Sequence, residues 1–182
     1  TINVKFTNIM LKEKTPKVKE ENIKNYISTK IDNYFNLLNL SGITLQNKFG
    51  VHIINSELEA KSLATKLRIF FQIPIDASIP NLIHLLENQN IIILTVPKKI
   101  GENYFQGFYE IIENIPVIVV PEEDNGYDQR MMVALYLGHL LIMSNKNKNT
   151  LAEEFALSLL IPSKSLVNEF GTKRTKIHFN EI

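Results

Sequence analysis

The chain has 182 residues, 45% of them hydrophobic and 21% charged, which is typical of a globular protein with a sizeable core. Its 20 Lys and Arg residues nearly balance its 19 Asp and Glu residues, so a broadly basic surface for nucleic acid is excluded. The absence of Cys excludes disulfides and thiolate zinc sites, and no apolar run is long enough to cross a membrane. We therefore expect a soluble cytoplasmic protein with no membrane partner.

The first third of the chain predicts a linker followed by a connector. Residues 1–19 are polar and rich in Lys, which indicates a polar linker. Apolar residues then recur every three or four positions, which predicts an amphipathic helix over residues 20–40 that ends at Ser41-Gly42. We expect residues 20–55 to form this connector helix and a loop, and residues 56–182 to form the main domain.

The main domain begins with a predicted helix at Ser56, where Glu59 completes a capping box, and this helix ends before Pro74. The predicted elements after it are a short helix from Pro80 to Glu87, strands over 91–96, 108–112 and 116–120, and helices at about 128–144, 150–161 and 163–170. Glu113-Asn114 suits a hairpin turn between two of the strands. This order predicts an α+β fold in which helices pack a small antiparallel sheet.

Residues 134–139 have the outline of a zinc-peptidase helix without its chemistry. A zincin needs His-Glu-x-x-His, because two imidazoles four residues apart can share a zinc ion while the Glu activates the metal-bound water. Here only the second imidazole, His139, is present; Leu135 stands at the first His and Tyr136 at the Glu. Leu cannot ligate a metal, and a phenol is a poor base at neutral pH. We therefore predict no metal ligand and no catalytic residue.

The sequence around this helix carries a longer pattern. Its matching residues are Arg130, Gly138, His139, Leu140, Leu141, Ala152, Phe155, Ala156, Leu160 and Pro162. In this order they resemble the ImmA/IrrE family of metallopeptidases, whose Arg-led helix ends His-Glu-Leu-Gly-His-Leu-Leu before a second helix that supplies a Glu ligand. The third ligand would be expected within residues 149–151, which are Asn, Thr and Leu, and Glu153 is a shifted carboxylate. The resemblance implies a degenerate zincin-like helix pair.

The upstream half extends the resemblance. Ala64-Thr65-Lys66-Leu67-Arg68 and the apolar residues 91–93 are similar to ImmA/IrrE proteins fused behind a helix-turn-helix domain of the xenobiotic-response-element type. The connector helix is also similar to the segment that joins the two parts. The chain begins with Thr, so we expect a DNA-binding domain to precede it in the intact protein.

The resemblance implies a regulator. We expect the effector-sensing and dimerisation portion of a transcriptional repressor from a phage or mobile genetic element. Its catalytically dead pseudo-peptidase fold would bind an inducer or anti-repressor protein, without a cofactor. Operator DNA would be contacted by a homodimer through the helix-turn-helix that this chain lacks. The residues expected at the partner-binding cleft are Tyr136, His139, Glu153 and Glu154, and those with structural roles are Arg130, Gly138 and Pro162.

Two other functions stay open at this point. An active zinc metallopeptidase with an unorthodox site would cleave a repressor and lose that activity in His139→Ala. An antitoxin or immunity-type binding protein would have no DNA-binding domain. Individual residues also have plainer explanations, because His139 suits a packed histidine and Glu153-Glu154 suits the positive end of a helix macrodipole.

Overall fold

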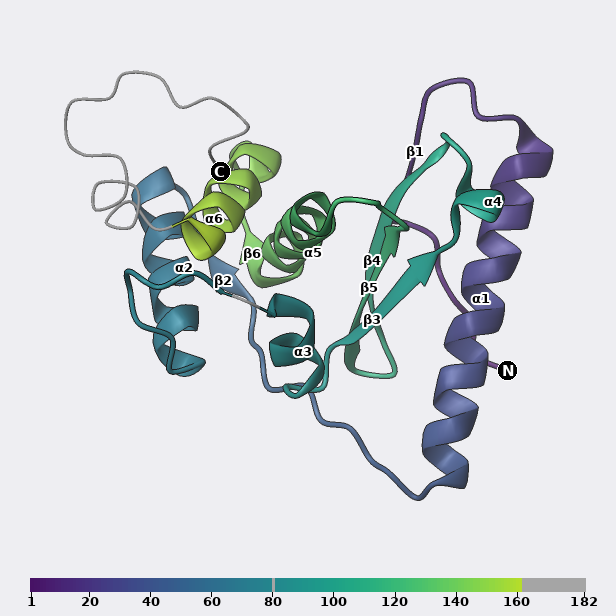
Figure 1. Cartoon of the computed structure of the whole chain (residues 1–182), viewed down its shortest axis with the longest axis horizontal. Coiled ribbons are helices and arrows are strands. Elements are labelled where there is room, and N and C mark those ends of the chain that lie inside the picture. The colour runs from purple at the N-terminus through teal and green to yellow at the C-terminus, as the bar shows by residue number, and fades with distance from the viewer. Residues whose placement is uncertain (80, 162–182) are drawn as a thin grey trace.

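The computed structural model describes residues 1–79 and 81–161, which form an α+β fold (Figure 1). These residues contain a four-stranded main sheet and a two-stranded parallel sheet, in which His52–Ile53 pairs with Ile142–Met143. The helices are α1 (Lys17–Leu40), α2 (Glu57–Phe70), α3 (Leu82–Glu87), α4 (Lys98–Gly101), α5 (Gly126–Leu141) and α6 (Lys148–Leu160). The strands are β1 (Ile9–Leu11), β2 (His52–Ile53), β3 (Ile92–Val96), β4 (Phe105–Ile112), β5 (Ile115–Pro121) and β6 (Ile142–Met143). None of the helices within these ranges is long and apolar enough to cross a membrane.

The main sheet is mixed, so the expectation of an antiparallel sheet is wrong in one pairing. Its order is β1-β4-β5-β3, and β3 pairs with β5 in parallel whereas the other pairs are antiparallel. The chain reverses between β3 and β4 and again at the hairpin, and β5 therefore returns beside β3 in the same direction. Glu113 and Asn114 form that predicted hairpin turn with φ of 49° and 62°, a combination typical of two-residue hairpins.

Helices cover both faces of the sheet (Figure 1). α1 packs on one face through residues that recur at helical spacing and are buried, namely Ile23, Ile27, Ile31 and Phe35. On the other face lies α5, with α6 and α2 packed behind it. β5 is buried on both sides: Val117 and Val119 face α1, whereas Ile118 and Val120 face α5. A strand covered on both faces is apolar throughout, as the sequence of β5 is.

Part of the segment expected to be a polar linker belongs to the sheet. Ile9–Leu11 forms β1 at one edge and pairs with β4, with a register shift between Met10 and Leu11. The residues before β1 contact α1, because the backbone N–H of Ile2 donates a hydrogen bond to the Asp32 carboxylate over 2.8 Å. A three-residue edge strand between polar residues carries too little apolar periodicity to be predicted.

Side-chain caps determine where several helices begin. Ser56 accepts a hydrogen bond from the backbone N–H of Glu59 over 3.2 Å, which confirms the predicted start of α2. Asn125 and Asn147 cap α5 and α6, so both helices begin two residues earlier than expected. Asn81 caps α3, which therefore begins at Leu82. The helix expected at 163–170 lies outside the described residues.

Candidate functional site

The helix pair that resembles a zincin is closely packed. Gly138 of α5 faces α6, where an added Cβ would come within 2.9 Å of the Phe155 ring and 3.2 Å of the Ala152 Cα. Gly138 therefore allows the two helix backbones to approach each other more closely than a larger residue would. Arg130 fixes the other end of α5, because its Nη1 donates to the carbonyl of Ile79 over 3.2 Å.

Tyr136, which the resemblance aligns with the peptidase base, points from α5 towards β4. Its hydroxyl donates a hydrogen bond to the carbonyl oxygen of Gln106 over 2.5 Å, and its side chain is buried. Burial raises the pKa of the phenol well above its usual value of 10.0, so it stays protonated at any physiological pH. Its ring lies against Gly107, whose φ of +154° and missing Cβ leave room for it. Tyr136 thus fills space and satisfies a backbone carbonyl.

His139 packs in a stack of aromatic rings. Its imidazole lies 5.1 Å from the Tyr109 ring at an interplanar angle of 14°, and Tyr109 also stacks on Tyr136 at 5.8 Å. The residue is only 8% exposed, and its Nδ1 has no hydrogen-bond partner among residues 1–79 and 81–161. Burial, and secondarily the positive charge of Lys148, lowers the pKa of His139 to about 4. The imidazole is therefore neutral at pH 7.

The depressed pKa predicts a loss of stability in mild acid. The pKa of His139 in the unfolded chain is 6.5. Well above this pH the imidazole is neutral in both the folded and the unfolded protein, so its titration does not change the free energy of unfolding. As the pH falls from 6.5 towards about 4, the unfolded chain takes up a proton that the folded protein does not. The free energy of unfolding should therefore fall by about 2 kcal/mol between about pH 7 and pH 5 from this residue.

Urea unfolding at the two pH values measures this effect. The matched variant is His139→Phe, which keeps an aromatic ring on Tyr109 but cannot titrate. The difference in pH dependence between wild type and variant isolates the histidine from all other groups. Equal pH dependence in the two proteins would contradict the assignment of a low pKa to His139.

The residues at the expected zinc positions do not fit zinc. Leu135 and Leu151 are hydrocarbon side chains, and the Tyr136 hydroxyl is already bonded to Gln106. Only His139 offers a nitrogen there. Over the described part of the chain, no group of three or more His, Asp or Glu side chains could hold a metal ion. We therefore derive no reaction step through a metal.

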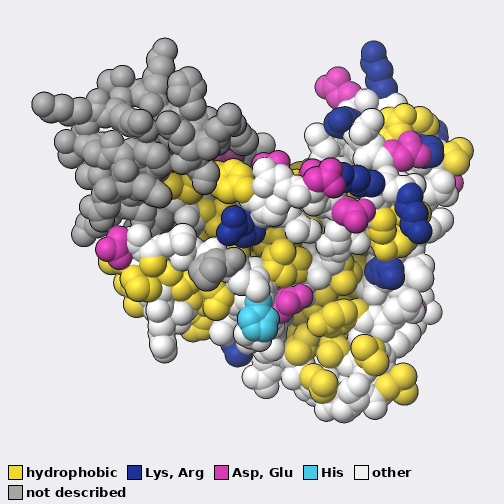
Figure 2. Space-filling view, in the orientation of Figure 1, with side chains coloured by type: hydrophobic (Ala, Val, Ile, Leu, Met, Phe, Trp, Pro, Cys, Tyr) yellow, Lys and Arg dark blue, Asp and Glu magenta, His cyan; other side chains and the backbone are white. Residues whose placement is uncertain are grey.

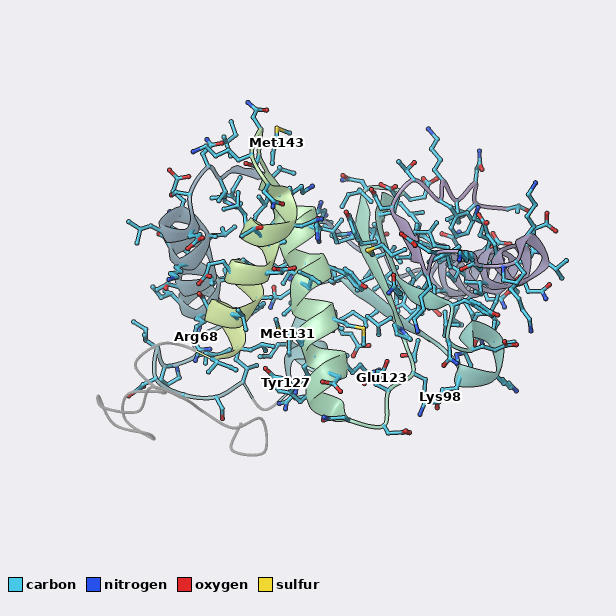
Figure 3. All side chains as sticks on the ribbon, turned by 90° about the horizontal axis from the view of Figure 1, so that it is seen from above. Arg68, Lys98, Glu123, Tyr127, Met131 and Met143 are labelled. Carbon is cyan, nitrogen blue, oxygen red and sulfur yellow. The ribbon has the colours of Figure 1, made fainter. Side chains whose placement is uncertain are left out.

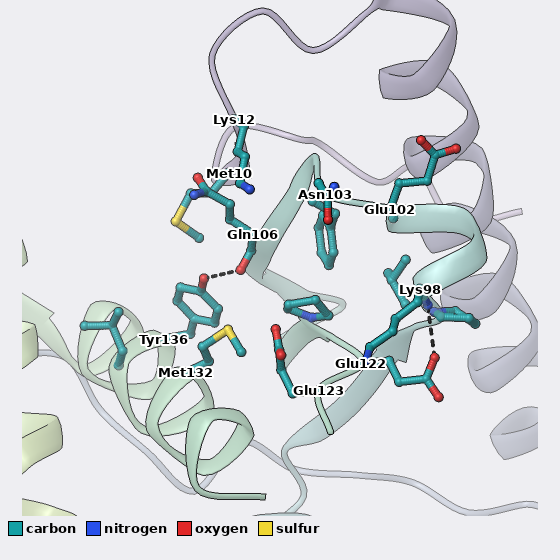
Figure 4. A pocket seen from close by; sticks show the side chains of 16 residues that line it. Met10, Lys12, Lys98, Glu102, Asn103, Gln106, Glu122, Glu123, Met132 and Tyr136 are labelled. Atoms are coloured by element: carbon teal, nitrogen blue, oxygen red, sulfur yellow. Dashed lines mark hydrogen bonds between the residues drawn. The ribbon is translucent and has the colours of Figure 1, made fainter. Parts of the chain in front are cut away.

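A groove of about 960 Å³ opens between α5 and the sheet edge (Figure 4). Leu135, Tyr136 and Met132 of α5 form one wall. Met10 of β1 and Lys12, which directly follows β1, form part of another. The remaining lining residues come from the ends of β3, β4 and β5 and from α4: Val96, Pro97, Lys98, Gly101, Glu102, Asn103, Phe105, Gln106, Pro121, Glu122 and Glu123. Charged side chains of both signs gather on the surface between α5 and α4 (Figure 2).

Of the four residues expected at one cleft, only Tyr136 lines this groove. His139 lies beneath it in the ring stack, and Glu153 is exposed on α6. Glu154 faces α2, where its carboxylate lies 3.3 Å from the Lys61 ammonium. The four side chains do not converge, because α6 presents its carboxylates away from the sheet. Pro162 lies outside the described residues.

Comparison with models of known protein families gives no match, and comparisons with curated proteins and with solved structures give none either. The comparisons therefore do not test the resemblance to ImmA/IrrE proteins, which rests on sequence motifs. The groove is defined by the residues of this chain and does not depend on similarity to another protein.

Proposed function

We propose that this chain is the effector-sensing portion of a transcriptional repressor from a phage or mobile genetic element. In this proposal its peptidase-like helix pair binds a protein inducer without cleaving it. The observation that carries the proposal is the position of Leu135 and Tyr136. Both stand where the resemblance places catalytic groups, and both line the groove. A concave surface is thus kept at this position without the residues for hydrolysis.

Regulation would follow from linkage. An inducer that binds one arrangement of a repressor dimer more tightly than another shifts the population towards the arrangement it prefers. If that arrangement holds the DNA-binding domains at the wrong spacing, repression is relieved. The dimer, the cytoplasmic location and the operator contacts through a preceding helix-turn-helix all belong to this proposal.

The proposal predicts a protein without stoichiometric zinc. Protein purified after growth with added zinc is expected to contain far less than one zinc per chain by elemental analysis, because His139 is the one imidazole on α5 and α6 and the Glu153 and Glu154 carboxylates do not converge on it. One zinc per chain that is lost in His139→Ala would instead support a metallopeptidase with an unorthodox site.

The proposed role in transcriptional repression is tested by a separate measurement of DNA binding. The protein encoded by the complete reading frame is expected to retard a DNA fragment that carries its own promoter in a gel-shift assay. A scrambled fragment of equal length and base composition is the control, because phosphate contacts alone bind both. Equal affinity for the two fragments would overturn the repressor proposal.

A further inference from the structure

The groove carries more acidic than basic charge beside Lys98, because three consecutive acidic residues share this one nearby ammonium group. Glu122, Glu123 and Asp124 follow β5 in the sequence. Asp124 forms an ion pair with Lys98, and Glu122 accepts a hydrogen bond from the Lys98 backbone N–H over 3.0 Å. Glu123 lines the groove and has neither an ion pair nor a hydrogen bond within the described residues. It stands beside Met132 and points into the open space (Figure 4).

The other charged residues around the groove do not form an ion pair with Glu123 within the described part of the chain. Glu102 is paired with Lys19 of α1, so that pair is neutral. Lys12 lies on the β1 wall, across the groove from the β5–α5 connection (Figure 4). Seen from above, Glu123 and Lys98 both lie on the sheet side of α5, whereas Arg68 lies on its other side (Figure 3). The groove lining thus carries three carboxylates, from Glu102, Glu122 and Glu123, and two ammonium groups, from Lys12 and Lys98.

The rest of the groove is suited to apolar side chains. Met10 and Met132 line it from β1 and α5, and Leu135 adds a branched apolar side chain. Methionine side chains are flexible and polarizable, so surfaces that carry them adapt to different apolar partners. Met10 and Lys12 are two residues apart at the β1 end of the groove, as expected for side chains on one face of an extended segment. β1 is also an edge strand, and such edges accept extended segments of other chains.

We propose that the groove binds an extended peptide segment of a protein partner, with apolar side chains between Met10 and Met132 and a Lys or Arg opposite Glu123. This rests on the proposed function and names the chemistry of the inducer surface. Since the Lys98 ammonium is paired with Asp124, the Glu123 carboxylate is left to select a basic side chain through charge complementarity. The same carboxylate repels phosphate groups, so this groove is a poor site for nucleic acid.

Random peptides displayed on phage and selected against the whole chain supply the probe. The expected consensus is an apolar sequence with one basic residue at a fixed position, and a synthetic consensus peptide then gives a Kd by fluorescence polarisation. Glu123→Lys is expected to weaken this peptide about tenfold and to favour a peptide with Glu in place of the basic residue. Glu153→Lys is the matched control, because Glu153 is exposed on α6 outside the groove.

The results of this peptide experiment distinguish failure of the Glu123 assignment from failure of the proposed repressor function. Peptides that lose binding in Met132→Arg but show no basic preference would overturn the Glu123 assignment and leave a peptide-binding groove. Equal effects of Glu123→Lys and Glu153→Lys would overturn it as well. If no selected peptide depends on Met132, the groove is not a peptide site, and both this inference and inducer binding at the groove fail. Promoter binding by the intact protein would remain a separate result.

Discussion

Replacing Arg68 with Ala is expected to lower the free energy of unfolding by about 3 to 5 kcal/mol. Arg68 of α2 is only 1% exposed, yet its guanidinium joins three separate parts of the chain. Its Nη1 donates to the Leu159 carbonyl over 2.5 Å, and its Nη2 donates to the carbonyls of Pro74, over 2.7 Å, and Ala77. Alanine would remove the donor from the buried Leu159 carbonyl, release the loop that carries the Pro74 and Ala77 carbonyls, and open a cavity between α2 and α6.

Urea unfolding followed by far-UV circular dichroism measures this loss. Lys66→Ala, on an exposed position of the same helix, is the control and should change stability by less than about 0.5 kcal/mol. Arg68→Lys should fall between the two, because a single ammonium cannot replace a planar fork with several fixed donors. A stability of Arg68→Ala within the range of the control would show that the three carbonyls find other partners.

The sequence predicts those parts of the fold that are determined by residues close together in the chain. The burial of Ile23, Ile27 and Ile31 follows from helical spacing alone. The start of α2 follows from the Ser56 side chain, and the β4–β5 hairpin follows from two residues that tolerate positive φ. In each case the residues that decide the structure lie within a few positions of one another.

The parts that the sequence does not predict depend on distant segments. The direction of β3 relative to β5 depends on the position of β4 in the sheet. The spacing of apolar residues along the sequence does not contain this information. The groove is built from β1, α4, α5 and three strand ends, so its lining residues share no motif. Glu123 could not be singled out, since an exposed carboxylate in a turn is usually solvated surface. Tyr136 could be found only through the resemblance, which marks its position but not its contacts.

Replacing Gly107 with Ala is expected to lower the free energy of unfolding by about 3 kcal/mol, from two causes of similar size. The φ of +154° is one that residues with a side chain rarely adopt. In addition, an added Cβ would come within 2.3 Å of the Tyr136 ring, which cannot move away while its hydroxyl bonds to Gln106. Gly101→Ala is a comparison in a looser site, where the nearest atom, the Cβ of Phe105, is 3.2 Å away.

A double-mutant cycle with Tyr136→Leu separates the two causes. Removing the ring removes the steric conflict but leaves the backbone strain, so Gly107→Ala should cost at least about 1 kcal/mol less in the Tyr136→Leu background. Additive effects would mean that the ring does not rest on Gly107. A large coupling would establish that the Tyr136 ring holds α5 against β4. In that case a smaller side chain could not be placed at residue 136 without also changing how β4 packs against α5 at Gly107.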